Sequence, residues 1–203
     1  EVFDVSASEI ELITFHGNAG NDVFKNRTSI PSHAVGGSGN DLLQGGSGDD
    51  FLDGVSGNDT LRGGSGDDQL HGGSGADVIR GQNGADEAFG NSGNDHIKGG
   101  RGNDVIHGGS GNDHLIGNRG SDHLLGGSGH DRLSGGFHND VLEGNSGRDT
   151  LLGGRHADVL RGGSNHDKLY GQRGRDVLHG GTGNDLLDGG SSADVLRGDE
   201  GND

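Results

Sequence analysis

A nine-residue period constrains this chain more than any other feature. Starting at Gly36, the sequence divides into nonapeptides without insertion or deletion through Arg197, which makes 18 complete units. One earlier unit, GNAGNDVFK, covers residues 17–25, and a truncated unit, GDEGND, ends the chain. A period held over this length indicates a solenoid, in which each unit stacks on its neighbours around one narrow core.

Four positions of the unit are nearly fixed. Position one is Gly and position six is Asp in every unit, and position eight is Leu, Ile or Phe in every complete unit except at Ala88. Position four is Gly except at His138, His156, Asn165 and Ser192. Glycine adopts positive φ angles and lets carbonyl groups converge, so we expect the first six residues to form a turn. The last three residues then form a short strand whose middle residue faces the interior.

The composition predicts a very thin core. The chain has 203 residues, of which 48 are Gly and only 26% are hydrophobic, and its formal net charge is -17. Such values lie near those of disordered chains, and a single column of Leu and Ile from each side is too little to offset the backbone entropy. Other interactions must therefore hold the coils together. The excess of acidic over basic residues favours cations as partners and argues against nucleic acid. No apolar run approaches membrane-spanning length.

The invariant Asp supplies a candidate for those interactions. If two units make one coil, residues 18 apart stack roughly 4.8 Å from each other. Asp95 and Asp113 would then belong to one column of carboxylates, and Asp104 and Asp122 to the opposite one. Like charges at that distance repel unless a cation separates them, and carboxylate and carbonyl oxygens suit calcium better than magnesium, zinc or copper. The alternative, an Asp that only bonds its own turn, would vary to Asn or Ser over 20 copies.

The predicted calcium ligands are the position-six carboxylates of residues 36–203. They are Asp41, Asp50, Asp59, Asp68, Asp77, Asp86, Asp95, Asp104, Asp113, Asp122, Asp131, Asp140, Asp149, Asp158, Asp167, Asp176, Asp185, Asp194 and Asp203. Their two columns leave nine and eight gaps, an upper bound of 17 calcium ions. We expect weaker sites beside turns whose position four is not Gly, and we expect the Ala88 unit, GQNGADEAF, to be the weakest point of the stack.

The pattern G-G-x-G-x-D-x-U-x, with U a large apolar residue, resembles the hemolysin-type calcium-binding repeat of RTX proteins over residues 36–203. The resemblance implies an all-β fold, a right-handed parallel β-roll with two nonapeptides per coil and calcium between the stacked turns. It also implies a bacterial protein that leaves the cell by type I secretion.

The first 35 residues differ from the rest. They hold the only Pro, Pro31, and a ten-residue insertion from Asn26 to Val35. We interpret residues 1–35 as an N-terminal capping coil with one early repeat, and residues 36–203 as the calcium-binding β-roll. The chain begins without Met and no cap follows Asp203, so we expect the array and neighbouring domains to continue in a longer parent protein.

No enzyme motif was found. H-E-x-x-H, G-x-S-x-G and the P-loop are absent from the sequence. The 12 His scatter over four positions of the unit, and only His96 and His114 are expected to stack, so we interpret them as surface residues and not as a metal site. We expect a non-catalytic, calcium-binding structural module of a secreted, extracellular or cell-surface bacterial protein, which folds on calcium binding outside the cell.

Three alternatives stay open. An adhesin or ice-binding face would use the outward rank of Ser38, Ser56, Ser74, Ser92, Ser110, Ser128, Ser146, Ser164 and Thr182. A polyanion-binding face, for instance for an acidic polysaccharide, would use Arg101, Arg119, Arg155 and Arg173, although these arginines can also simply offset the carboxylates. The chain can also be an accessory domain of a larger secreted hydrolase or epimerase.

Overall fold

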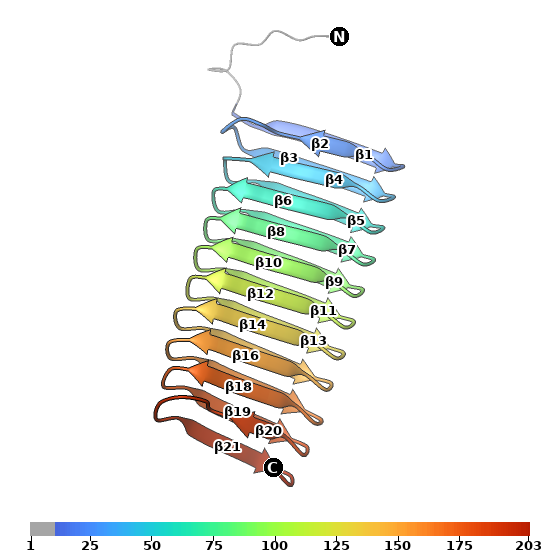
Figure 1. Ribbon diagram of the computed structural model, residues 1–203. Helices are drawn as coiled ribbons and strands as arrows, with labels where there is room; N and C mark the ends of the chain where they lie inside the picture. Colours follow the sequence, from blue (N-terminus) through green and yellow to red (C-terminus); the bar gives the residue numbers. More distant parts are fainter. Residues whose placement is uncertain (1–10) are drawn as a thin grey trace, which may run out of the picture.

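The computed structural model describes residues 11–203 as a stack of parallel coils (Figure 1). Odd-numbered strands form an 11-stranded sheet, and even-numbered strands form a 10-stranded sheet. Each strand pairs with the strand two places along the chain, so every coil contributes one strand to each sheet. The predicted fold class is therefore confirmed: an all-β parallel β-roll with two nonapeptides per coil. Within residues 11–203, no helix has the length and apolar character needed to cross a membrane.

The 11-stranded sheet contains β1 (Ile13–Ala19), β3 (Ser32–Ser38), β5 (Phe51–Ser56), β7 (Gln69–Ser74), β9 (Glu87–Ser92), β11 (Val105–Ser110), β13 (His123–Ser128), β15 (Val141–Ser146), β17 (Val159–Ser164), β19 (Val177–Thr182) and β21 (Val195–Glu200). The 10-stranded sheet contains β2 (Val23–Lys25), β4 (Leu42–Gly46), β6 (Thr60–Ser65), β8 (Val78–Asn83), β10 (His96–Arg101), β12 (His114–Arg119), β14 (Arg132–Phe137), β16 (Thr150–Arg155), β18 (Lys168–Arg173) and β20 (Leu186–Asp188).

Most strands are six residues long, so the prediction of a three-residue strand after a six-residue turn was wrong. A strand such as β11 begins at position seven of one unit and ends at position three of the next. The glycines at positions one and two lie inside the ladder because each faces the same position of the next coil, for example Gly109 opposite Gly127. Identical repeats in register can pair their backbones without help from side chains, and only positions four to six are left to turn the chain.

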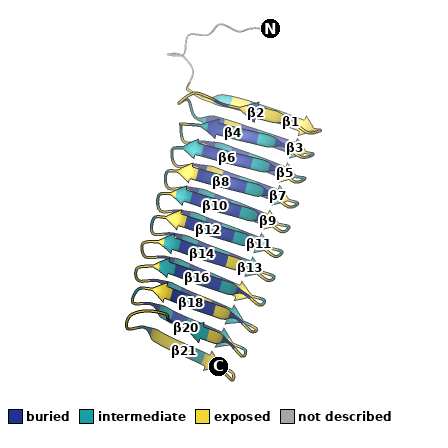
Figure 2. Cartoon of the chain, in the orientation of Figure 1, coloured by how far each residue is buried: buried dark blue, intermediate teal, exposed yellow. Residues whose placement is uncertain are grey.

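The core is one side chain wide, as the composition predicted. Position eight of each unit points inward from both sheets, and the strand centres in Figure 2 are accordingly buried. The fully enclosed apolar side chains include Leu61, Ile79 and Leu115 of one sheet and Leu52 and Leu124 of the other. Ala88 also lies in this column, 1% exposed, with Leu70 and Ile106 as its partners in the neighbouring strands.

Residues 26–35 are not an insertion outside the coil. Phe15 of β1 pairs with Ala34 across an offset of 19 residues, whereas Ala34 pairs with Leu52 across the usual 18. This segment therefore supplies one divergent unit of nine residues plus one extra residue, and β3 continues past residue 35. Its start lies around buried Asn26, whose Oδ1 accepts hydrogen bonds from the backbone N and Oγ1 of Thr28.

A capping role for residues 1–35 stays a prediction, and residues 1–10 lie outside the part of the chain that the structure describes.

Candidate metal-binding sites

Each position-six Asp connects its coil to the preceding one through a single carboxylate oxygen. The backbone N of Asp95 donates to Asp113 Oδ1 at 2.8 Å, and the backbone N of Asp113 donates to Asp131 Oδ1 at 2.8 Å. The same bond occurs at every step from Asp41 to Asp203 along one edge and from Asp50 to Asp194 along the other. The predicted 18-residue register of the two Asp columns is thus present.

The second carboxylate oxygen of these residues is buried and has no hydrogen-bond partner. This holds for Oδ2 of Asp22 and of each position-six Asp from Asp41 to Asp185. A buried carboxylate oxygen that has lost its water and gained no partner is strongly unfavourable unless a proton or a cation neutralises it. The structure therefore presents two rows of oxygens, each oriented by the Oδ1 hydrogen bond and free to bind a cation.

The invariant glycines make room for these oxygens. A Cβ atom added at position-one Gly90 would collide with Asp95 Oδ2 and lie 2.6 Å from the carbonyl oxygen of Gly108, in the next coil. A side chain at position one would therefore occupy the space where the carboxylate and a backbone carbonyl approach each other. Position four is constrained differently, since a Cβ on Gly84 would collide with the carbonyl oxygen of Gly66.

This oxygen set fits calcium. Among residues 11–203, no three His, Asp or Glu side chains converge on one point, so backbone carbonyls must complete the coordination of any bound ion. Carboxylate and carbonyl oxygens without nitrogen or sulfur ligands are typical of calcium, whose coordination is also flexible enough for a site made of turns.

Burial raises the pKa values of the position-six aspartates from Asp50 to Asp176 in the metal-free chain. Desolvation is the main cause, and it is opposed by the backbone hydrogen bond and reinforced by neighbouring carboxylates of the same column. It raises the pKa of Asp59 and Asp113 to about 6, of Asp104 to about 7, and of Asp68 and Asp140 to about 8. Without calcium, the ionised columns therefore oppose folding near neutral pH.

The four exceptions at position four keep the turn geometry of glycine. His138, His156, Asn165 and Ser192 have φ angles of 78°, 84°, 81° and 108°, in the left-handed region that Gly adopts elsewhere in the stack. Each of these residues adopts a conformation that is unfavourable for a side chain, Asn least so. Weaker calcium binding beside them, and beside Ala88, stays a prediction.

The ends of the columns differ from their middle. Asp22 lies outside the predicted ligand set but belongs to the first column, because its backbone N donates to Asp41 Oδ1 at 2.7 Å. Its unit, GNAGNDVFK, matches the repeat and could have identified Asp22 as a member of the column. In the other column Ser32 takes the place of an Asp, and its backbone N and Oγ both donate to Asp50 Oδ1. Asp194 and Asp203, in the last two turns, are more exposed than the others.

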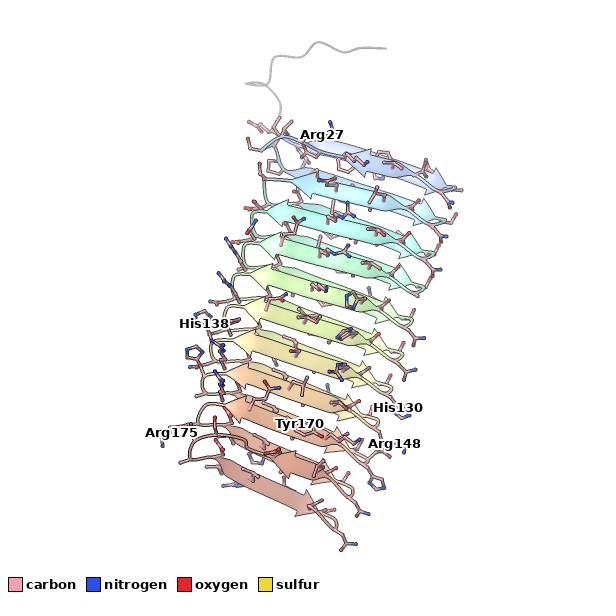
Figure 3. All side chains as sticks on the ribbon, viewed as in Figure 1. Arg27, His130, His138, Arg148, Tyr170 and Arg175 are labelled. Atoms are coloured by element: carbon pink, nitrogen blue, oxygen red, sulfur yellow. The ribbon has the colours of Figure 1, made fainter. Side chains whose placement is uncertain are left out.

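Sequence reasoning missed a second ladder, at position five. Asn58 Oδ1 accepts a hydrogen bond from the backbone N of Ala76 at 2.7 Å, and the same contact recurs along both edges. At His130 a ring nitrogen replaces the amide oxygen, and Nδ1 accepts from the backbone N of Arg148 at 2.9 Å. Figure 3 shows these two residues on the turns of one edge. Asn, Asp and His are frequent at position five, and this pattern could have predicted the second ladder.

The prediction that only His96 and His114 stack was wrong. Their own contact is confirmed, with ring centroids 4.8 Å apart. A longer stack follows the outer face of the 11-stranded sheet from β1 to β11, with centroid separations of 4.7 to 6.4 Å between neighbouring rings. Its members are His16, His33, Phe51, His71, Phe89 and His107.

Comparison with known protein families agrees with this geometry. A family model described as the RTX calcium-binding nonapeptide repeat (4 copies) matches residues 33–61, 53–88, 80–115, 89–124, 107–142, 116–151, 134–169 and 170–203. These overlapping matches together cover the chain continuously from residue 33 to residue 203. A search of curated proteins found no match. With this repeat over most of its length, the chain belongs to the RTX calcium-binding nonapeptide repeat family and is a calcium-binding β-roll.

Proposed function

We propose that this chain is a non-catalytic structural module of a secreted bacterial protein, unfolded where calcium is scarce and folded by calcium outside the cell. The observation that carries the proposal is the row of buried, unpaired Asp Oδ2 atoms along each edge of the roll. When they are ionised, these carboxylate rows destabilise the folded roll. A bound divalent cation neutralises them and stabilises it. Binding and folding are then one equilibrium.

The proposal assigns one calcium ion to a gap between stacked turns. Position-six Oδ2 atoms, such as that of Asp95, bind the ion together with backbone carbonyl oxygens of the turns. The Oδ1 atom stays hydrogen-bonded to the backbone of the preceding coil, which fixes the orientation of the carboxylate. Because each Asp belongs to a continuous column, filling one gap orders the turns that form the next one, and we expect cooperative folding.

An ice-binding or adhesive role for the Ser rank has less support. The hydroxyls of Ser56, Ser146 and Ser164 donate to backbone carbonyls of their own sheet at 3.1 to 3.3 Å. A hydroxyl that is already bound to the protein is less available to an external ligand. Attachment to a larger secreted hydrolase or epimerase is a separate proposal, which the sequence of the parent protein tests.

Circular dichroism and calcium titration test the proposed function. The calcium-free chain should give a largely disordered far-UV spectrum, and calcium at sub-millimolar to millimolar concentration should produce a β spectrum and a more compact particle in size-exclusion chromatography. Magnesium at equal concentration should not. A β spectrum of the same intensity with and without calcium would refute coupled binding and folding.

A further inference from the structure

The positive charges of this acidic protein are concentrated on one face. Ten of its 15 Lys and Arg residues lie on strands of the 10-stranded sheet, and that sheet has no acidic residue from β4 to β18. The ten are Lys25, Arg62, Arg80, Lys98, Arg101, Arg119, Arg132, Arg155, Lys168 and Arg173. A rank of four arginines was visible in the sequence, but it is only part of this surface.

The cations form a continuous band. Every strand from β6 to β18 in this sheet carries at least one Lys or Arg, and these strands follow one another down one face of the stack (Figure 1). The band begins at position nine, where Arg62 pairs with Arg80 and Arg80 with Lys98. It moves to position three on β10, where Arg101 pairs with Arg119. Cations thus recur at about one strand spacing, roughly 4.8 Å.

The band continues across β14 through an aromatic residue. Phe137 lies between Arg119 and Arg155 in the register, and their guanidinium carbons are 5.9 and 5.0 Å from the centre of its ring. These cation–π contacts hold the two arginines along the band while leaving Phe137 40% exposed. Arg155 then pairs with Arg173 on β18.

The opposite face has no comparable charge. From β7 to β19, the 11-stranded sheet carries only three acidic or basic residues besides histidine, namely Glu87, Glu143 and Arg161. Arg161 is already paired with Glu143 at 3.0 Å. The position-six Asp columns lie at the turns between the two faces, and bound calcium neutralises them. In the calcium-loaded roll, the band is therefore a cationic surface that no acidic side chain from β4 to β18 of its own sheet offsets.

A groove lies along the middle of the band. It has a volume of about 520 Å³, and Arg101, Arg119 and Phe137 line it together with the amide side chains of Gln82 and Asn118. Guanidinium groups bind carboxylates through paired hydrogen bonds, and amide groups donate to and accept from hydroxyls. The lining therefore suits a ligand that carries both groups in alternation.

We propose that the outer face of the 10-stranded sheet binds a linear polyuronate, a polysaccharide with one carboxylate on each sugar ring. Such a polymer repeats its charge at about the strand spacing, and its hydroxyls match the amides of the groove. Nucleic acid carries a higher charge density, about one phosphate per 3.4 Å on each strand, and gains affinity from aromatic surfaces that are free to stack on bases. Here Phe137 is occupied by two guanidinium groups.

This inference rests on the proposed function, because the band exists only in the folded roll. Its test uses the full chain in saturating calcium and a short fluorescent oligouronate, followed by fluorescence anisotropy, with circular dichroism recorded on the same samples. We expect binding that weakens with added salt and disappears in calcium-free buffer, where the roll unfolds. An uncharged oligosaccharide of the same length should not bind.

A matched pair of variants locates the surface. Replacing Arg101, Arg119, Arg155 and Arg173 by Ser uses the residue that stands at position three elsewhere in the same sheet, as in Ser65. It should weaken binding by at least about tenfold without changing the calcium-loaded spectrum. The control replaces Arg148 and Arg175, which lie on the turns at opposite edges (Figure 3), by Gln. It should change affinity by less than about twofold.

The outcomes separate the two proposals. A β spectrum with calcium but no oligouronate binding, or an equal loss of binding in both variants, would refute the cationic surface and leave the calcium-dependent module intact. A chain that calcium does not fold would refute the module itself. Tighter binding of single-stranded DNA or of anionic lipid vesicles than of the oligouronate would overturn the assigned ligand class.

Discussion

At the scale of single residues, the two oxygens of each Asp have separate tasks. Oδ1 of Asp113 accepts the backbone N–H of Asp95, while its Oδ2 is buried and unpaired. An Asn would satisfy the first task and not the second, because its amide nitrogen cannot bind a cation. Position five needs only one acceptor, and Asn, Asp and His all serve there, as Asn112 and His130 do. The difference explains why position six does not vary among the units while position five does.

Asp113→Asn should therefore have opposite effects with and without calcium. The variant keeps the hydrogen bond to Asp95 and removes a buried charge, so the calcium-free chain should become easier to fold. Calcium affinity should fall at the two gaps that share Asp113. Calcium titration measures the loss of affinity, and the far-UV circular dichroism of the calcium-free variant measures its gain of β structure.

Asp203→Asn is the matched control, since Asp203 accepts the same bond from Asp185 but is exposed in the last turn. It should change little. Equal losses of calcium affinity in the two variants would mean that the columns do not share their ions.

At the scale of strands, side chains on the outer face add stability where the inner core is thinnest. β9 contributes only Ala88 to the core, and its next residue, Phe89, stacks outside between His71 and His107 at 4.7 and 4.8 Å. The prediction that the Ala88 unit is the weakest point of the stack rests on its missing core side chain and on Glu87 beside the gap. The outer rings supply contacts that the core lacks at this strand.

Phe89→Ala should accordingly destabilise the calcium-loaded roll by about 1–3 kcal/mol, since it removes two ring contacts. Leu125→Ala is the control, because Leu125 occupies the same column on β13 without stacking on a ring on both sides. Urea denaturation in saturating calcium measures the two losses. A loss for Leu125→Ala as large as that for Phe89→Ala would show that the stack adds nothing specific.

At the scale of the whole molecule, the features that the sequence predicted are those tied to a fixed position of the repeat. Gly36, Asp41 and Leu43 mark positions that recur unchanged, so coil length, register, core column and Asp columns followed from the period. The ring stack combines positions seven and nine, since Phe51 and His71 belong to different columns of the unit. The cationic band likewise changes column at β10. Such surfaces appear only when the sheet places different positions side by side.

The stacked, buried carboxyl groups of the two Asp columns also set the pH dependence of the metal-free chain. Burial raises the pKa of Asp86 to about 7 and of Asp140 to about 8, above the value of about 3.9 in an unfolded chain. The folded state therefore binds more protons than the unfolded state between about pH 4 and 8. Stability without calcium is present at the acid end of this window and is lost as the pH rises through the folded pKa values.

Histidine titration opposes this trend only in part. Burial lowers the pKa of His96, His107 and His114, so their protonation below about pH 6.5 favours the unfolded chain. Many more aspartates than histidines are shifted, so the carboxyl effect dominates.

We therefore expect the calcium-free chain to gain β structure when the pH is lowered from 8 towards 5, and calcium uptake near pH 5, where the folded coils hold protonated aspartates, to release protons. Far-UV circular dichroism of the calcium-stripped chain and proton release in weakly buffered solution measure the two effects. The Asp113→Asn variant, with one titrating group fewer, should release fewer protons. A calcium-free chain that loses β structure on acidification would show that the aspartates are not buried in the folded coils.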